Sequence, residues 1–260
     1  MLFSLMGLTF VIHLIDTLAY SVRLNSVKSG KYALSLSLFN IFVLVSRTAN
    51  MFQAPLIGLL IGMSIANQMD PIKEIRFVLA SATMGTLVGV GLIPTFLKLF
   101  SKAVDRLEVK GSVPSIVVEA LSVSNIKRIV KNTTRPKKRM INSLRYREIP
   151  KRFLLLNTFI TAVYTIGVIS AYYAAFFVGE DYRLSASASS GMINGIATIL
   201  LTLLVDPQVA IITDQALRKK RPYGDVKALV VLLIATKFLG TILGQVLIYP
   251  AAMIIASFYH

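Results

Sequence analysis

The stretch Ser46-Arg47-Thr48-Ala49-Asn50-Met51-Phe52-Gln53-Ala54-Pro55 decides how the rest of the chain is interpreted. It places one cation, two amides and a proline inside a run that is otherwise apolar from Ala33 to Ala66. That run is longer than the roughly 20 residues that one bilayer crossing needs. An arginine near its centre is costly unless it faces protein or water. We therefore expect a helix broken near Arg47–Pro55, or a polar cavity at this depth, and both indicate transport.

The composition is that of an integral membrane protein. Of the 260 residues, 55% are hydrophobic and only 15% are charged, whereas a soluble domain carries about 25% charged residues. The absence of cysteine excludes disulfides and thiolate metal sites. The sequence therefore predicts an all-α integral membrane protein with one transmembrane domain over residues 1–260.

A bundle of about six transmembrane helices is expected from the apolar segments. These segments are Leu2–Tyr20, Ala33–Ala66, Phe77–Leu97, Phe153–Val178, Met192–Gln215 and Leu229–Tyr259. No Lys or Arg precedes the first segment, which argues against a cleaved secretory signal. We expect this segment to be retained as the first membrane helix.

The basic residues set the expected orientation. Most of the 28 Lys and Arg residues lie in the stretches 21–32, 98–152 and 216–228. Basic loops remain on the cytoplasmic side of a membrane. We therefore expect these three loops in the cytoplasm and both termini outside.

The stretch 98–152 is the expected long basic loop between the third and fourth spans. Apolar residues from Pro114 onward approximate helical spacing, which indicates an amphipathic helix within the loop. Its basic residues favour contact with anionic membrane lipids. No nucleic-acid recognition module accompanies the charge, so nucleic acid is not an expected partner.

Three spans precede the long loop and three follow it, and this division has the geometry of an inverted repeat. Sequence similarity between the halves is not evident, so the repeat is left open. Three GxxxG pairs allow close helix contact, and they are Gly58/Gly62, Gly85/Gly89 and Gly240/Gly244. A homo-oligomer is left open as well.

Charged groups within the spans are candidates for a coupling site. Asp206 and Lys237 are expected at similar depths in consecutive helices, either as a structural ion pair or lining a water-filled cavity with Arg47. His13 and Asp16 in the first span complete this set. A lone His13 is also compatible with simple packing.

Enzymatic chemistry is not expected. The chain has no GxxxxGK[ST] phosphate loop, no HExxH and no GxSxG elbow. It also lacks a His and carboxylate cluster with metal-ligand spacing. We expect no catalytic residue, no cofactor and no metal.

Three stretches of the first 60 residues resemble the Amj family. These are His13-Leu-Ile-Asp16-Thr-Leu-Ala-Tyr20-Ser-Val-Arg23, Ala33-Leu-Ser-Leu-Ser-Leu-Phe-Asn40 and Leu44-Val-Ser-Arg47-Thr-Ala-Asn50-Met-Phe-Gln53-Ala-Pro55. The resemblance implies a lipid II flippase of the bacterial cytoplasmic membrane, an alternate to MurJ. Its substrate would be the undecaprenyl-diphosphate-linked peptidoglycan precursor.

Such a substrate needs a cationic, hydrated route for its polar head. Arg47 is the candidate ligand for the diphosphate through its bidentate fork, with Asn50 and Gln53 beside it. At the cytoplasmic mouth the candidates are Arg23, Lys28 and Lys31.

Two other functions are left open. One is an ion-coupled secondary transporter of a small anionic solute, with Asp206 and Lys237 as its coupling pair. The other is a structural membrane protein with a dry interior. A lateral gap between helices favours the flippase, and a closed wall favours the solute carrier.

Overall fold

The structure, a computed structural model, describes residues 1–112, 144, 146 and 149–259. Six of its helical segments are long and apolar enough to cross a membrane, which confirms the expected all-α membrane fold. The elements are α1 (Leu2–Ser29), α2 (Tyr32–Ala66), α3 (Ile72–Lys110), α6 (Lys151–Phe177), η3 (Glu180–Tyr182), α7 (Arg183–Leu200), η4 (Leu201–Val205), α8 (Asp206–Leu217), α9 (Tyr223–Ala256) and η5 (Ser257–Tyr259). The elements α7, η4 and α8 together form the fifth span.

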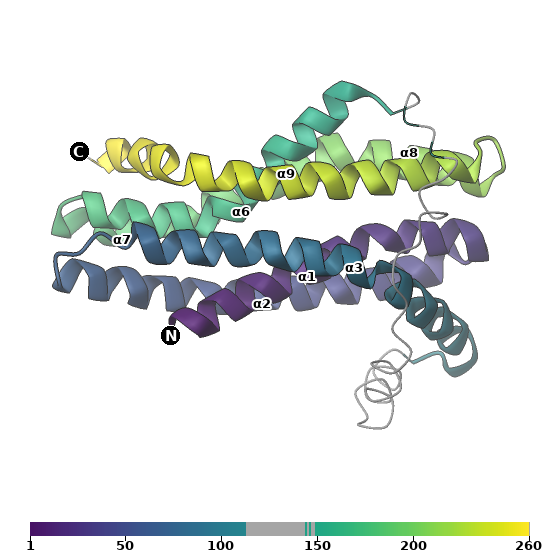
Figure 1. Cartoon of the computed structure of the whole chain (residues 1–260), viewed down its shortest axis with the longest axis horizontal. Helices are drawn as coiled ribbons and strands as arrows, with labels where there is room; N and C mark the ends of the chain where they lie inside the picture. Colours follow the sequence, from purple (N-terminus) through teal and green to yellow (C-terminus); the bar gives the residue numbers. More distant parts are fainter. Residues whose placement is uncertain (113–143, 145, 147–148, 260) are drawn as a thin grey trace.

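The spans lie side by side along one axis (Figure 1). At one end, here called the basic end, α1, α3 and α8 finish and α2, α6 and α9 begin. At the opposite end, α2 turns into α3 and α6 turns into α7, and the C-terminus lies beside these turns (Figure 1).

The second span is not broken, so the predicted interruption near Arg47–Pro55 is wrong. The helix α2 is continuous from Tyr32 to Ala66 with Pro55 inside it. Proline removes one intrahelical hydrogen bond, whereas an unwound segment in lipid would leave several backbone groups without partners. At about 1.5 Å per residue, α2 is roughly 50 Å long, so it tilts or extends beyond the hydrocarbon.

An irregularity lies instead in the fifth span. The element η4, Leu201–Val205, is a π-helical turn, and Asp206-Pro207 follows it directly at the start of α8. Such turns occur often at functional sites. The proline is at the first turn of α8, where its missing N–H costs little.

Two helices extend further toward the basic end than their apolar segments predict. The helix α1 continues to Ser29, so Asp16 lies near the middle of this helix. The helix α3 continues to Lys110 and bends away from the bundle (Figure 1), so the first part of the stretch 98–152 is helical. The amphipathic helix predicted after Pro114 lies outside the described residues.

Two of the GxxxG pairs pack helices within the chain. A Cβ on Gly85 would collide with the backbone carbonyl of Phe10 on α1, and one on Gly240 would lie 2.7 Å from the carbonyl of Thr158 on α6. Glycine is therefore required where α3 crosses α1 and where α9 crosses α6.

The end opposite the basic end is closed by an apolar core. Leu5, Ile57, Ile75 and Tyr173 are fully buried there, each on a different helix. The Tyr173 hydroxyl also donates a hydrogen bond of 2.8 Å to Asp70 in the turn between α2 and α3. Two further apolar clusters, which include Leu233 and Phe100 respectively, lie toward the basic end, and the polar cavity described below lies in the same part of the bundle.

Candidate functional site

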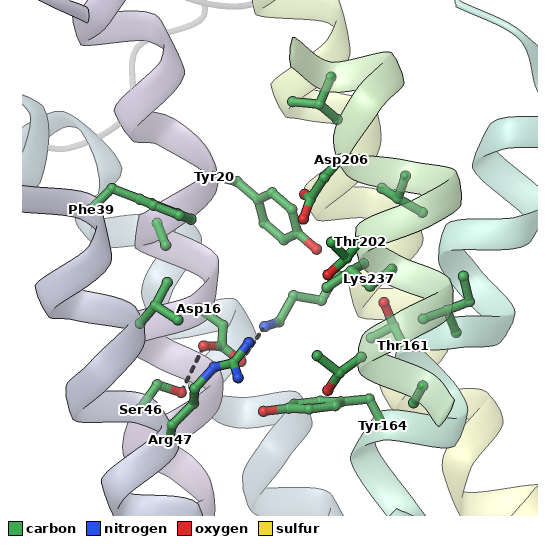
Figure 2. Close-up of a pocket in the computed structure, with 18 of the residues that line it drawn as sticks. Asp16, Tyr20, Phe39, Ser46, Arg47, Thr161, Tyr164, Thr202, Asp206 and Lys237 are labelled. Carbon is green, nitrogen blue, oxygen red and sulfur yellow. Dashed lines mark hydrogen bonds and ion pairs between the residues drawn. The ribbon is translucent and has the colours of Figure 1, made fainter. Parts of the chain in front are cut away.

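A polar cavity of about 310 Å³ lies between α1, α2, α6, the fifth span and α9. Figure 2 shows its labelled side chains converging from these helices. Its ionisable lining residues are His13, Asp16, Tyr20, Arg23, Arg47, Tyr164, Asp206 and Lys237. The cavity expected around Arg47 from the sequence is therefore present in the structure.

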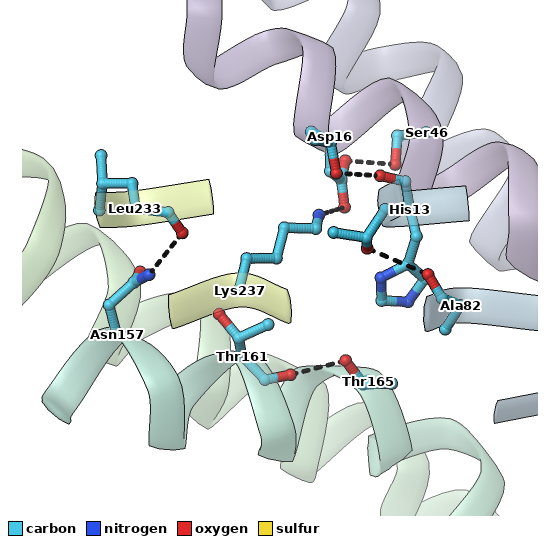
Figure 3. A network of polar contacts seen from close by, with 11 residues as sticks. His13, Asp16, Ser46, Ala82, Asn157, Thr161, Thr165, Leu233 and Lys237 are labelled. Carbon is cyan, nitrogen blue, oxygen red and sulfur yellow. Dashed lines mark hydrogen bonds and ion pairs between the residues drawn. The ribbon is translucent and has the colours of Figure 1, made fainter. Parts of the chain in front are cut away.

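An ion pair between α1 and α9 forms one wall of the cavity. The Nζ of Lys237 lies 3.3 Å from Oδ2 of Asp16, and the Lys237 side chain is only 4% exposed. Ser46 on α2 donates a 2.7 Å hydrogen bond to the other carboxylate oxygen of Asp16 (Figure 3). Lys237 also lies 5.8 Å from the centre of the Tyr20 ring, a cation–π contact. Asp16 thus receives one ligand from each half of the chain.

A second ion pair stands between this cavity and a neighbouring one of about 290 Å³ toward the basic end. Arg23 lies 3.7 Å from Asp206, and its guanidinium carbon lies 5.4 Å from the centre of the Phe39 ring. Four residues line both cavities, namely Arg23, Phe39, Asn40 and Asp206. The two cavities therefore adjoin at these four residues and together form one route.

The predicted pairing of Asp206 with Lys237 is wrong. Lys237 pairs with Asp16, and Asp206 pairs with Arg23. The prediction rested only on the depth of each residue along its helix. Depth does not specify the direction in which a helix face points, so it could not identify the partners. The two ion pairs each join α1 to an element of the second half of the chain.

Arg47 points from α2 into the cavity (Figure 2) and is exposed there. Among the residues that the structure describes, it has no ion-pair partner. The cavity lining carries three cations, Arg23, Arg47 and Lys237, against the two carboxylates Asp16 and Asp206. Its formal excess of one positive charge, with histidine neutral, suits an anionic group.

His13 lies on the cavity wall one helical turn from Asp16 and is only 3% exposed. Its Nδ1 has no hydrogen-bond partner within the described part of the chain. A buried nitrogen without a partner is unfavourable, so a water molecule or a ligand group in the cavity is the natural partner.

Four other predicted binding residues do not line either cavity. Gln53 is buried and donates to the Thr9 hydroxyl at 2.6 Å, so it joins α2 to α1. Asn50 is half-buried on α2, and Lys28 is exposed on α1. Lys31 is held by Asp105 and Glu108, each at 2.7 Å.

The hydrogen bond to Asp105, and to a smaller extent the one to Glu108, raises the pKa of Lys31. Because both partners belong to α3, Lys31 connects the start of α2 to the end of α3. It is therefore a surface contact between helices at the basic end and does not contribute charge to the cavity.

Sequence reasoning did not select the hydroxyl groups of the cavity. Ser46, Thr161, Tyr164 and Thr202 all line it, and Figure 2 shows them on three different elements. Ser46 begins the stretch that carries Arg47, and this proximity was the only available signal. In the described ranges, no group of three His, Asp or Glu side chains is placed to hold a metal ion.

Fold and cavity together define a polytopic membrane protein that can hold an anionic polar group at membrane depth. The model of the Amj family, described as "Alternate to MurJ", matches residues 8–259, and this chain belongs to that family. A curated relative, lipid II flippase Amj of Bacillus subtilis (strain 168), is 39% identical over 248 residues. The match covers 95% of this chain and 92% of the relative. No solved structure matches the chain.

Proposed function

We propose that this protein is a lipid II flippase of the bacterial cytoplasmic membrane. It would move the undecaprenyl-diphosphate-linked peptidoglycan precursor from the inner to the outer leaflet. The family and the relative from Bacillus subtilis support this function. Such a translocation leaves the substrate chemically unchanged, so the protein acts as a transporter and not as an enzyme.

The observation that carries the proposal is a cationic cavity whose walls on α2 and on the fifth span pack little against each other. The walls formed by α2 and by the fifth span belong to helices that make at most marginal contact with each other in the described structure. The apolar residues of both spans are mostly exposed or half-buried at the surface of the bundle. We infer a lateral opening between these spans, through which the polar head would enter the cavity while the apolar tail remains in lipid.

The charges of the cavity suit the diphosphate of this substrate. Arg47 is the proposed ligand, because its guanidinium faces the cavity and can bind two phosphate oxygens at once. The ion pair of Asp16 and Lys237, with His13 beside it, would form the polar floor of the site, and Arg23 and Asp206 would lie at its entrance. The cavity is near the lower limit of ligand sites, about 300–1,000 Å³, so the sugar and peptide require the route to widen.

The orientation follows from the charge distribution. We place the basic end in the cytoplasm, because basic loops remain on that side. The cavities toward this end would then receive lipid II from the inner leaflet. The basic residues of 98–152 would contact anionic lipids there.

A reconstituted system tests the function. Purified protein is placed in vesicles that contain lipid II with a fluorescent label on its head group, and an impermeant reagent quenches the outer-leaflet label. Protein-containing vesicles should lose nearly all fluorescence, whereas empty vesicles should lose about the half that faces outward. The proposal fails if protein-containing and empty vesicles behave alike.

The same vesicles distinguish the rival function, an ion-coupled transporter of a small anionic solute. Exchange of inorganic pyrophosphate across the membrane, without lipid II movement, would support that alternative. That alternative would also need α2 and the fifth span to form a closed wall, whereas these two spans pack little against each other.

A further inference from the structure

The two halves of the chain have the same internal packing in opposite orientation. In the first half, α1 packs most extensively against α3 and then against α2. In the second half, α6 packs in the same way against α9 and then against α7. The helix α1 runs toward the basic end, whereas α6 runs away from it (Figure 1). This is the arrangement of an inverted repeat.

The glycine contacts give the register between the halves. Gly85 of α3 meets the carbonyl of Phe10, and Gly240 of α9 meets that of Thr158. One turn later, a Cβ on Gly89 would lie 3.3 Å from the carbonyl of Leu14, and one on Gly244 would lie 3.8 Å from that of Ala162. Leu14 is four residues after Phe10, and Ala162 is four residues after Thr158. The two helix crossings therefore share one register, in which residue n of α1 corresponds to residue n + 148 of α6.

The sequences agree once this register is applied. Residues 78–89 of α3 read VLASATMGTLVG, and residues 233–244 of α9 read LIATKFLGTILG. From Val78 to Leu87, every residue has the same degree of burial as its counterpart between Leu233 and Ile242. The same agreement holds from Leu5 to His13 of α1 and from Phe153 to Thr161 of α6. Identical burial over these two stretches supports a common three-helix unit.

The second and fifth spans follow the same pattern with one inserted residue. The buried residues Ser35, Leu38 and Ser46 correspond to Ala186, Ser189 and Ala197, an offset of 151 in residue number. After the π-helical turn, the offset is 152, and Gln53, Ile57 and Leu60 correspond to Val205, Val209 and Ile212. Pro55 corresponds to Pro207 in this register. The turn η4 therefore marks the position of the extra residue.

The cavity contains both members of several counterpart pairs. His13 and Thr161, Asp16 and Tyr164, and Arg47 and Thr198 all line it. A cavity lined by both members of such pairs lies at the pseudo-two-fold axis, where transporters with inverted repeats bind their substrates. Toward the basic end the route continues past Asp206 and Ala210. Their counterparts, Ala54 and Gly58, lie in the half of α2 that is further from the basic end, here called its outer half.

We propose that residues 1–110 and 151–259 form an inverted repeat, and that the counterpart of the second cavity is a release site for the polar head of the lipid-linked substrate. This site lies between the outer half of α2 and the helices α6 and α7. It opens when the cavity toward the basic end closes. The assignment of the ligand rests on the proposed function, whereas the repeat does not.

The present structure has the release site closed. A Cβ on Gly58 would lie 3.0 Å from the ring of Tyr172, and Tyr173 donates to Asp70 across the same end. At the basic end, Ala210 is exposed and lines the second cavity. The side-chain nitrogen of Asn25, the counterpart of Tyr173, has no hydrogen-bond partner among the described residues. The hydrogen bond between Tyr173 and Asp70 therefore has no counterpart at Asn25 among the described residues, where Arg23 and Asp206 instead join the two halves at 3.7 Å.

Paired cysteines test the exchange between two states, and the cysteine-free chain needs no prior substitution. The pair Gly58→Cys and Tyr172→Cys reports the closed release site. Its counterpart pair, Leu24→Cys and Ala210→Cys, reports a closed basic end. Each pair is oxidised in full-length protein in vesicles, with and without lipid II, and translocation is measured before and after reduction.

We expect each pair to form a disulfide only in those molecules that are in the corresponding state. Oxidation of either pair should abolish translocation, and a reductant should restore it. In a four-cysteine protein, one disulfide should suppress the other. The proposal is overturned if both disulfides form in the same molecule, or if Leu24→Cys and Ala210→Cys never react in protein that translocates. If the wild-type protein moves no lipid II but the two disulfides still exclude each other, the proposed function fails and the repeat stands.

Discussion

Lys237 of α9 lies 3.3 Å from Asp16 of α1, and this ion pair joins the two halves of the chain at the wall of the cavity. Both partners come from helices that also carry the tight glycine crossings. The distance between these two charges therefore depends on how the two three-helix units pack against each other.

The first prediction concerns this pair. Asp16→Asn keeps an acceptor for the Ser46 hydroxyl but leaves the buried ammonium of Lys237 without a counter-ion. Loss of one partner of a buried pair costs about 3–5 kcal/mol, so the free energy of unfolding should fall by that order in detergent. Asp206→Asn is the matched control, because its carboxylate is 49% exposed and 3.7 Å from Arg23; its effect should be below about 1 kcal/mol. The double variant Asp16→Asn/Lys237→Gln should regain most of the loss.

The second prediction concerns Arg47. Arg47→Ala should lower lipid II translocation at least about tenfold, because a hydrogen bond to a charged group is worth about 1.5–3 kcal/mol and each 1.4 kcal/mol is a factor of ten. Thermal unfolding should be unchanged, since Arg47 has no ion-pair partner among the described residues. Lys28→Ala removes an equal charge outside the cavities and should translocate normally. Equal losses in both variants would mean that overall charge, and not the site, determines the rate.

The third prediction concerns the crossing of α1 and α3. Gly85→Ala places a methyl group against the Phe10 carbonyl, and overpacking of this kind costs about 1–3 kcal/mol. Gly91→Ala on the same helix meets nothing within 4 Å and should leave thermal unfolding unchanged. Indistinguishable unfolding curves for the two variants would contradict the crossing described here.

The fourth prediction concerns the latch between Tyr173 and Asp70. Tyr173→Phe removes a 2.8 Å hydrogen bond and retains the ring in the apolar core. We expect the closed release site to be less populated, so the disulfide between the cysteines at 58 and 172 should form in a smaller fraction of molecules. Tyr182→Phe removes an exposed hydroxyl at the same end and serves as the control. An unchanged disulfide fraction in Tyr173→Phe would show that the hydroxyl does not hold this end closed.

Much of the fold could be predicted from the sequence. Apolar length and charge distribution gave six spans, and Arg47 within Ala33–Ala66 indicated a cavity. The sequence did not decide whether the helix breaks at Pro55. A proline within a lipid-exposed helix costs one hydrogen bond, whereas unwinding costs more, so the helix continues. The apolar segment that stops at Leu97 did not predict that α3 ends at Lys110, because charged residues can continue a helix beyond the membrane.

The site was predicted only in part. Arg23, Arg47, His13, Asp16, Asp206 and Lys237 were selected, and all six line the cavity. Gln53, in contrast, donates a hydrogen bond to Thr9, because a fraction of a helical turn, about 100° per residue, decides whether a side chain on α2 faces the cavity or α1. Helical phase relative to the neighbouring helices depends on packing, which a single sequence does not specify.

The sequence by itself determined that this chain crosses a membrane six times, since the hydrophobic effect acts on each apolar segment locally. It also carried the family resemblance in its first 60 residues. Only the tertiary structure decided which charges pair, because Asp16 and Lys237 are brought together by the crossing of distant helices. The same crossings set the register that relates Gly85 to Gly240, and without that register the likeness of the two halves is obscured by the opposite directions of their helices.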